Sequence, residues 1–134
     1  MAVFGFGASY GGTNDVSGKF IKQGIACVGW QPKEAPPLHT ILKHIKTGDI
    51  IYLKSQPPSI GLIIKAVGIV TGHKVKKYSE GFGIRVRWIW IGEKRLQQIR
   101  DGCRPVRNLT LFEEYNFDVQ SVVIKLLLTE LNKL

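Results

Sequence analysis

The chain has 134 residues, of which 44% are hydrophobic and 22% charged, and its 19 Lys or Arg against 10 Asp or Glu give a formal net charge of +9. This length predicts a single domain over residues 1–134 and excludes two domains of ordinary size. The positive charge favours an anionic partner, most often nucleic acid, although a basic surface can also serve solubility alone.

The cysteine content and the lack of targeting segments bear on location. Two cysteines, Cys27 and Cys103, are too few for a disulfide framework and suit a reducing compartment. The sequence has no basic region followed by a long apolar run at its start, and no apolar stretch long enough to span a membrane. We therefore expect a cytoplasmic protein without a membrane partner.

The first part of the chain is expected to form two short strands around a helix. Residues 2–6 have the pattern of a strand, and a glycine-rich loop follows them. One of residues 13–15 is expected to cap a short helix that buries Phe20 and ends at Gly24. The small apolar residues 25–29 predict a strand that is buried on both faces.

A helix and two strands are expected next. Pro36 and Pro37 suit the first turn of a helix, where a backbone N–H is not needed. Apolar residues then recur at helical spacing, which places the polar residues of this segment, including His39, largely on the opposite face. Residues 50–55 predict a strand, and the β-rich run 61–70 predicts a central strand covered on both sides.

The middle of the second half is expected to mix a loop, a strand and a helix. Residues 72–83 are polar and basic, which predicts a loop, and residues 93–100 predict a short helix. Residues 84–91 alternate between apolar and other residues, which predicts a strand. One face of this strand would carry Ile84, Val86, Trp88 and Trp90, and the other Arg85 and Arg87.

The C-terminal segment predicts a short strand over residues 109–112 and then a helix capped by Asn116 or Asp118. The buried stripe of this helix would consist of Val119, Val122, Val123, Leu126 and Leu127. Five or six strands with helices at the edges predict an α+β domain. We expect a small, bent, mainly antiparallel β-barrel with flanking helices.

No combination of residues predicts catalysis. His39, His44 and His73 have no partners at metal-ligand spacing, and no glycine-rich segment ends in the Lys-Ser/Thr pair of a phosphate-binding loop. The adjacent Glu113 and Glu114 are expected to be solvated. We therefore predict a binding protein rather than an enzyme, with no catalytic residue, metal or cofactor.

Most of the positive charge falls within about a quarter of the chain. Between His73 and Arg107, ten Lys or Arg minus three Asp or Glu leave a charge of +7. A track of nucleic-acid phosphates needs such a concentration of cations, although the same charges could be scattered over solvated loops. The candidates for phosphate contacts are Lys54, Lys76, Arg85, Arg87 and Arg107.

Aromatic side chains could bind a base by stacking, in addition to the phosphate contacts. Trp30 follows the predicted strand 25–29, so it either stacks on an unpaired base or seals one end of the barrel. Trp88 and Trp90 belong either to the core or to the wall of a pocket, and Tyr52 suits a pocket or the sheet surface. Further candidates for base contacts are Tyr10, Ser55 and Asn108.

Several segments occur in an order that carries a family resemblance: Gly29-Trp30-Gln31-Pro32-Lys33, the helix over residues 38–45, Lys46-Thr47-Gly48-Asp49-Ile50-Ile51-Tyr52, Ser55, the strand 61–70 and Arg85-Val86-Arg87-Trp88-Ile89. In this order they resemble the EVE-type branch of the PUA-like superfamily, whose EVE, YTH, ASCH and PUA domains share a small bent barrel. The similar segments cover a little less than half of the chain. The glycine-rich start and residues 104–110 follow no family pattern.

The resemblance implies a nucleic-acid-binding module. EVE and YTH domains hold a modified base in an aromatic pocket, and related domains act as sensors in modification-dependent restriction. The resemblance places Trp30 as the first aromatic of such a pocket and Ser55 as a polar group near it, with Trp88, Trp90 or Tyr52 as the second aromatic. We expect a DNA or RNA partner whose base is flipped out onto Trp30.

This module would act in restriction or RNA metabolism, with an effector protein such as a nuclease or an ATPase. Two alternatives remain open from the sequence. One is a sensor of a small nucleotide, bound in the same pocket. The other is a protein-interaction module of a defence system, which would use the exposed face of the C-terminal helix.

Overall fold

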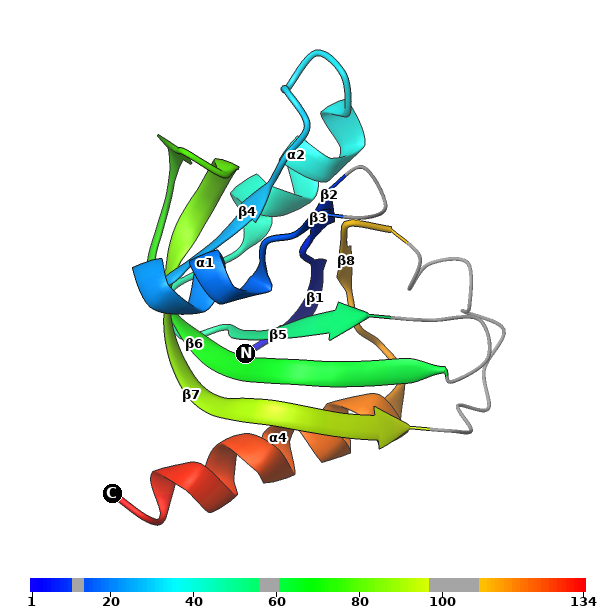
Figure 1. The fold of residues 1–134 in the computed structure, drawn as a ribbon, viewed down its shortest axis with the longest axis vertical. Helices are drawn as coiled ribbons and strands as arrows, with labels where there is room; N and C mark the ends of the chain where they lie inside the picture. The colour runs from blue at the N-terminus through cyan, green and yellow to red at the C-terminus, as the bar shows by residue number, and fades with distance from the viewer. Residues whose placement is uncertain (11–13, 56–60, 97–108) are drawn as a thin grey trace.

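The computed structural model describes residues 1–10, 14–55, 61–96 and 109–134 (Figure 1). The elements of the described residues are, in chain order, β1 (Val3–Gly7), β2 (Ser9–Tyr10), β3 (Asn14–Asp15), α1 (Ser17–Gln23), β4 (Ile25–Val28), α2 (Pro36–His44), β5 (Ile50–Ser55), β6 (Leu62–Tyr78), β7 (Gly81–Leu96), β8 (Leu111–Glu113) and α4 (Phe117–Leu131).

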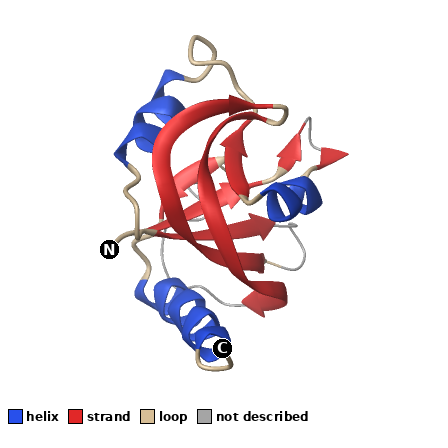
Figure 2. Cartoon of the chain, turned by 90° about the vertical axis from the view of Figure 1, so that its left-hand side faces the viewer, coloured by secondary structure: helices blue, strands red, loops and turns tan. Residues whose placement is uncertain are grey.

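A six-stranded sheet in the order β4-β7-β6-β5-β1-β8 forms the body of the molecule, and β2 and β3 form a separate two-stranded ribbon. Neighbouring strands of the large sheet pair antiparallel, except that β1 and β5 run parallel. The long strands β6 and β7 bend strongly, and the sheet curls into a half-barrel (Figure 1, Figure 2). Shifts of register along the β6–β7 ladder accompany this bend, since bulges bend the strand that contains them. The predicted α+β class with a bent, mainly antiparallel sheet is confirmed at this level of detail.

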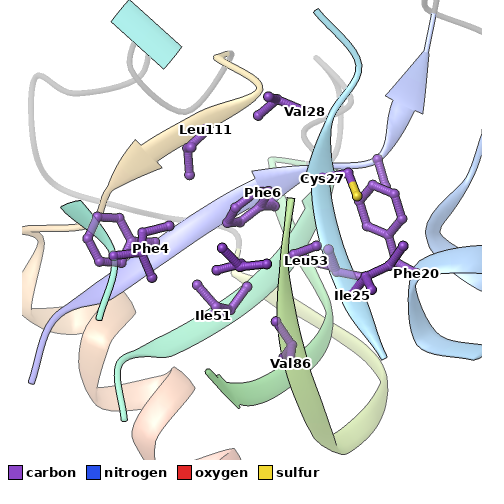
Figure 3. Close-up of a cluster of buried hydrophobic side chains, with 14 of the residues drawn as sticks. Phe4, Phe6, Phe20, Ile25, Cys27, Val28, Ile51, Leu53, Val86 and Leu111 are labelled. Atoms are coloured by element: carbon purple, nitrogen blue, oxygen red, sulfur yellow. The ribbon is translucent and has the colours of Figure 1, made fainter. Parts of the chain in front are cut away.

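Apolar side chains cover both faces of the curled sheet. The concave face holds one cluster, to which β1, β4, β5, β6, β7, α1 and α2 all contribute. Figure 3 shows part of this cluster, in which Phe6, Leu53 and Ile25 come from three different strands. A second cluster lies on the opposite face, where α4 packs Val119 and Val123 against the sheet. The sheet is therefore buried on two sides where its strands overlap α4.

The prediction that one of residues 13–15 caps α1 is wrong, because the N-cap is Val16, whose side chain makes no capping hydrogen bond. Three other helix ends follow the local sequence. Gly24 adopts φ 68° just after α1, a left-handed conformation that glycine tolerates best, and it ends the helix as predicted. Pro36 occupies the first turn of α2. The side chain of Asn116 accepts a hydrogen bond from the Val119 N–H at 3.0 Å and so caps α4. No helix in the described part of the chain is both long and apolar enough to cross a lipid bilayer.

The prediction of a loop over residues 72–83 is wrong. β6 continues through this segment to Tyr78, and β7 begins at Gly81 after a two-residue turn. The lysine side chains are exposed while Val75 and Tyr78 are half-buried against the concave cluster. Basic residues do not interrupt a strand whose side chains reach solvent, and the apolar residues between them mark its inner face.

The prediction of a helix over residues 93–100 is also wrong for its described part. β7 extends to Leu96, with Lys94 opposite Ile64 and Arg95 opposite Ile63. Pairing with β6 overrides the helical tendency of this polar segment. Residues 97–100 lie outside the described residues.

Trp88 and Trp90 do not share one face of β7, contrary to the prediction. Gly68 pairs with Trp88 and its neighbour Val67 pairs with Trp90, so Ile89 is an extra residue in the ladder. Such a bulge reverses the facing of the residues that follow it, up to the next register shift of the ladder. Trp88 therefore packs against the concave cluster and Trp90 against the α4 cluster.

Candidate nucleic-acid interface

Trp30 lies in the connection between β4 and α2, and the residue is half exposed (50%). Its backbone is nevertheless held in place. Nε2 of His39 donates to the Trp30 carbonyl oxygen at 2.7 Å, and the Gln31 N–H donates to a carboxylate oxygen of Glu34 at 2.8 Å. The indole is therefore presented to solvent from an ordered turn.

His39, which the helical pattern placed on the polar face of α2, is buried. Its ring meets that of Phe82 edge-on, with centroids 5.5 Å apart. Phe82 in turn has the ammonium group of Lys77 6.0 Å from its ring centroid, within the range of a cation–π contact. A chain of contacts thus runs from the Trp30 backbone through two rings to a cation on β6.

The strand register brings Trp30 close to the closed end of the β6–β7 hairpin. Val28, the last residue of β4, lies opposite Phe82, and Lys77 lies opposite the same Phe82 from the other side. Neighbouring strands are about 4.8 Å apart, which puts β6 about 10 Å from β4 at this level. Because Trp30 follows Val28 by two residues, the indole and the lysines next to the turn belong to one region.

Three of the predicted phosphate-binding residues gather on the outer face of this hairpin. Lys76 pairs with Gly83, Arg85 follows two residues later on β7, and Arg87 two residues after that, so alternation puts them on one side. All three side chains are exposed, and within the described ranges none has a carboxylate partner. We call Lys76, Arg85 and Arg87 the hairpin basic face. Lys77 points to the opposite, concave side, so both sides of the closed end are basic.

Tyr10 contacts both the turn of the β6–β7 hairpin and the segment that precedes Trp30. Its hydroxyl donates to the Glu80 carbonyl oxygen at 2.5 Å, which fastens the hairpin turn to the N-terminal segment. Its ring underlies Gly29, where an added Cβ would lie 3.0 Å from the Tyr10 Cζ. Burial is the main cause that raises the pKa of this phenol, so the neutral hydroxyl persists as a donor. Tyr10 lies close to Trp30, but as a half-buried support.

Tyr52 is fully buried and is not available to a base. Its hydroxyl donates to a carboxylate oxygen of Glu114 at 2.6 Å, and the other oxygen of Glu114 accepts the Asn116 N–H at 3.2 Å. Glu114 is buried as well, which corrects the expectation that it is solvated. The pair connects β5 to the start of α4, so its role is structural.

Lys54 is also buried, apart from the other cations. Its ammonium group lies 5.7 Å from the centroid of the Phe112 ring, on the face of the sheet that α4 covers. Burial lowers the pKa of this amine from 10.5 to about 8. Lys54 therefore does not join the hairpin basic face.

The remaining predicted site residues are dispersed. Ser55 is half-buried at the end of β5 and pairs with Ile63 in the first part of β6, away from Lys76 along the strand. Trp88 is half-buried, and its indole N–H donates to the Phe20 carbonyl oxygen at 3.1 Å. Trp90 lies on the α4 side. Asn108 and Arg107 fall outside the described residues.

The sequence reasoning missed Phe82 and Lys77 as neighbours of Trp30, and missed that His39 fixes the turn. A signal was present: Val75, Tyr78 and Phe82 recur within a segment interpreted as a polar loop. Their intervals of three and four residues do not have the alternation of a strand, so they indicated buried positions in this segment without predicting its strand structure. The histidine had no comparable signal, because its burial depends on the ring of Phe82 from another element.

No group of residues in the described part of the chain is arranged to hold a metal ion. A scan against models of protein families finds no match, and a search of curated proteins finds none either. The resemblance to EVE-type domains therefore rests on the sequence segments alone, and the functional argument rests on the geometry around Trp30.

Proposed function

We propose that the chain binds nucleic acid at the closed end of the β6–β7 hairpin, with one unpaired base stacked on Trp30. The observation that carries this proposal is the half-exposed indole on a hydrogen-bonded turn, beside a hairpin that is basic on both sides. Between Leu62 and Leu96, eight Lys or Arg minus two Glu leave a charge of +6.

Stacking supplies the base-dependent part of the affinity. A base on an aromatic ring contributes about 1–3 kcal/mol, and every base has a flat face to offer. The contacts from His39 and Glu34 hold the turn before binding. Ordering of this turn then costs little on association, which favours the proposal over a loosely held tryptophan.

The backbone of the nucleic acid would follow the cations. Lys77 is connected to the Trp30 turn through the rings of Phe82 and His39, and Lys76 extends the positive charge to the outer face. Arg85 and Arg87 are about 7 Å apart along β7, a separation that suits neighbouring phosphates of a single strand. Contacts of this kind make affinity depend steeply on salt.

The resemblance to EVE-type domains supports a finer version of the proposal. In that version the base is modified and flipped out of a DNA or RNA duplex. The chain then acts as a cytoplasmic sensor in modification-dependent restriction or RNA metabolism, beside a nuclease or ATPase. Cys27 is a free thiol buried in the core, which agrees with a reducing compartment.

The test is the Trp30→Ala variant, with Phe117→Ala as a matched control because Phe117 is an exposed aromatic (78%) on α4. Affinity is measured for a panel of modified and unmodified oligonucleotides at two salt concentrations. We expect Trp30→Ala to lose roughly 5–150-fold in affinity, the equivalent of one stacked base, while salt-sensitive binding persists. Equal affinities for the two variants and the unaltered chain would contradict the proposal.

A further inference from the structure

A groove of about 350 Å³ lies between β7 and α4, on the side of the sheet away from the concave cluster. Trp90 and Lys94 line it from the strand, and Val122, Lys125, Leu126 and Lys133 line it from the helix. This groove is separate from the Trp30 region, because Trp90 pairs with Val67 in the first part of β6 and faces α4.

The floor of the groove is apolar and includes an aromatic ring. Trp90 is half-buried, and its ring lies across Gly92, where an added Cβ would meet the Trp90 Cζ2 at 2.8 Å. Val122 and Leu126 are half-buried on the helix opposite, one turn apart. A flat ring entering the groove would meet the indole on one side and two aliphatic side chains on the other.

The rim of the groove is positively charged. Lys94 and Lys125 are exposed, and within the described residues neither is paired with a carboxylate. Lys133 is paired with Glu130 at 3.1 Å. Three lysines minus one glutamate leave two positive charges above an apolar floor. An anionic group on the ring-shaped ligand would complement them.

We propose that this groove binds a small anion with a planar ring, of the chemistry of a mononucleotide. The ring lies against Trp90, Val122 and Leu126, and the phosphate meets Lys94 and Lys125. The size supports a small molecule, because ligand pockets of proteins start at about 300 Å³. The charge complementarity supports an anion over an uncharged aromatic compound. This site is additional to the proposed nucleic-acid surface and does not depend on it.

The test uses the indole N–H signals of the three tryptophans in ¹H–¹⁵N NMR spectra of the full chain. The probe is guanosine 5′-monophosphate, and guanosine and inorganic phosphate serve as the ring-only and phosphate-only controls. We expect the nucleotide to shift the Trp90 signal saturably and to leave the Trp30 signal in place. Assignment of the Trp90 signal by Trp90→Phe completes the measurement.

Two pairs of variants then test the rim. Lys94→Gln with Lys125→Gln should weaken nucleotide binding roughly tenfold, because charge-assisted contacts are lost. Lys19→Gln with Lys22→Gln, which removes two exposed lysines of α1, should change nothing. A Trp90 signal unmoved by the nucleotide in the unaltered chain, or moved equally by guanosine, would overturn the proposal. Trp30→Ala should keep the nucleotide shift, so the failure of one site is distinguishable from the failure of the other.

Discussion

The two halves of β6 differ sharply in burial. Residues 62–70 are buried, apart from the half-buried Lys65 and Ile69, whereas residues 71–78 are all exposed or half-buried. The same ladder with β7 continues through both halves. Residues 62–70, the covered half, contribute side chains to both apolar clusters. Residues 71–78, the open half, carry the exposed lysines of the hairpin end near Trp30.

This contrast separates stability from binding along one strand. Substitutions in the covered half should change the free energy of unfolding and leave binding per folded molecule unaltered. Substitutions in the open half should change binding and leave the free energy of unfolding almost unaltered, since exposed side chains contribute little to stability.

The largest effect is expected from Ile64→Ala in the covered half. Ile64 is fully buried under α4, so the lost contacts and the remaining cavity should cost about 2–5 kcal/mol of unfolding free energy. Val75→Ala, in the open half and only half-buried, should cost about 1 kcal/mol or less. Denaturant unfolding measures both. Similar losses for the two variants would remove the distinction between the halves.

The next prediction compares the buried Lys54 with the exposed Lys76. The unfolded chain holds the Lys54 proton up to pH 10.5, and the folded chain releases it at about 8. Between these values the unfolded state binds more protons, so unfolding free energy should rise with pH across this window, by up to about 3 kcal/mol. Lys54→Met should abolish this pH dependence and should raise the unfolding free energy below pH 8. Lys76→Met, which replaces an exposed lysine, should leave the pH dependence unchanged. A pH series of denaturant unfolding checks this. A rise that survives in Lys54→Met would show another group to be its source.

A pair of tyrosines sharpens the comparison further. Tyr52→Phe removes the donor to the buried Glu114 and should cost about 1–3 kcal/mol. The buried hydroxyl of Tyr78, in the open half, has no hydrogen-bond partner among the described residues, so Tyr78→Phe should be neutral or stabilising. Thermal and denaturant unfolding distinguish the two. A destabilising Tyr78→Phe would contradict this account of the open half.

The smallest expected effect concerns salt. Arg85→Ala and Arg87→Ala should each reduce the slope of log affinity against log salt by about 1, because each removes one phosphate contact. Arg95→Ala is the control, because Arg95 is exposed but paired with Glu93 at 3.3 Å. Binding titrations of one oligonucleotide across a salt series measure the slopes. Equal slopes for all three variants would remove the hairpin basic face from the proposal.

The sequence predicted local features better than those set by distant residues. The C-terminal end of α1 at Gly24, the Asn116 cap of α4, the strand Ile50–Ser55 and the position of Trp30 at the end of an element follow from neighbouring residues, and the structure has all of them. The exposure of Trp30 was left open by the sequence. The facing of Trp90 did not follow, because the extra residue at Ile89 is defined only by pairing with β6. The buried Tyr52–Glu114 pair joins residues 62 positions apart, which no local pattern reveals.

The most direct test of the central claim locates the bound base. Oligonucleotides of DNA and RNA that carry one 5-iodouracil are irradiated with the full chain, because this base cross-links to aromatic side chains that lie against it. Mass spectrometry of the digested complex then identifies the attached peptide. The account predicts a cross-link at Trp30 that competes with unlabelled oligonucleotide. Cross-links found only at other residues, with Trp30 unmodified in both nucleic acids, would contradict it.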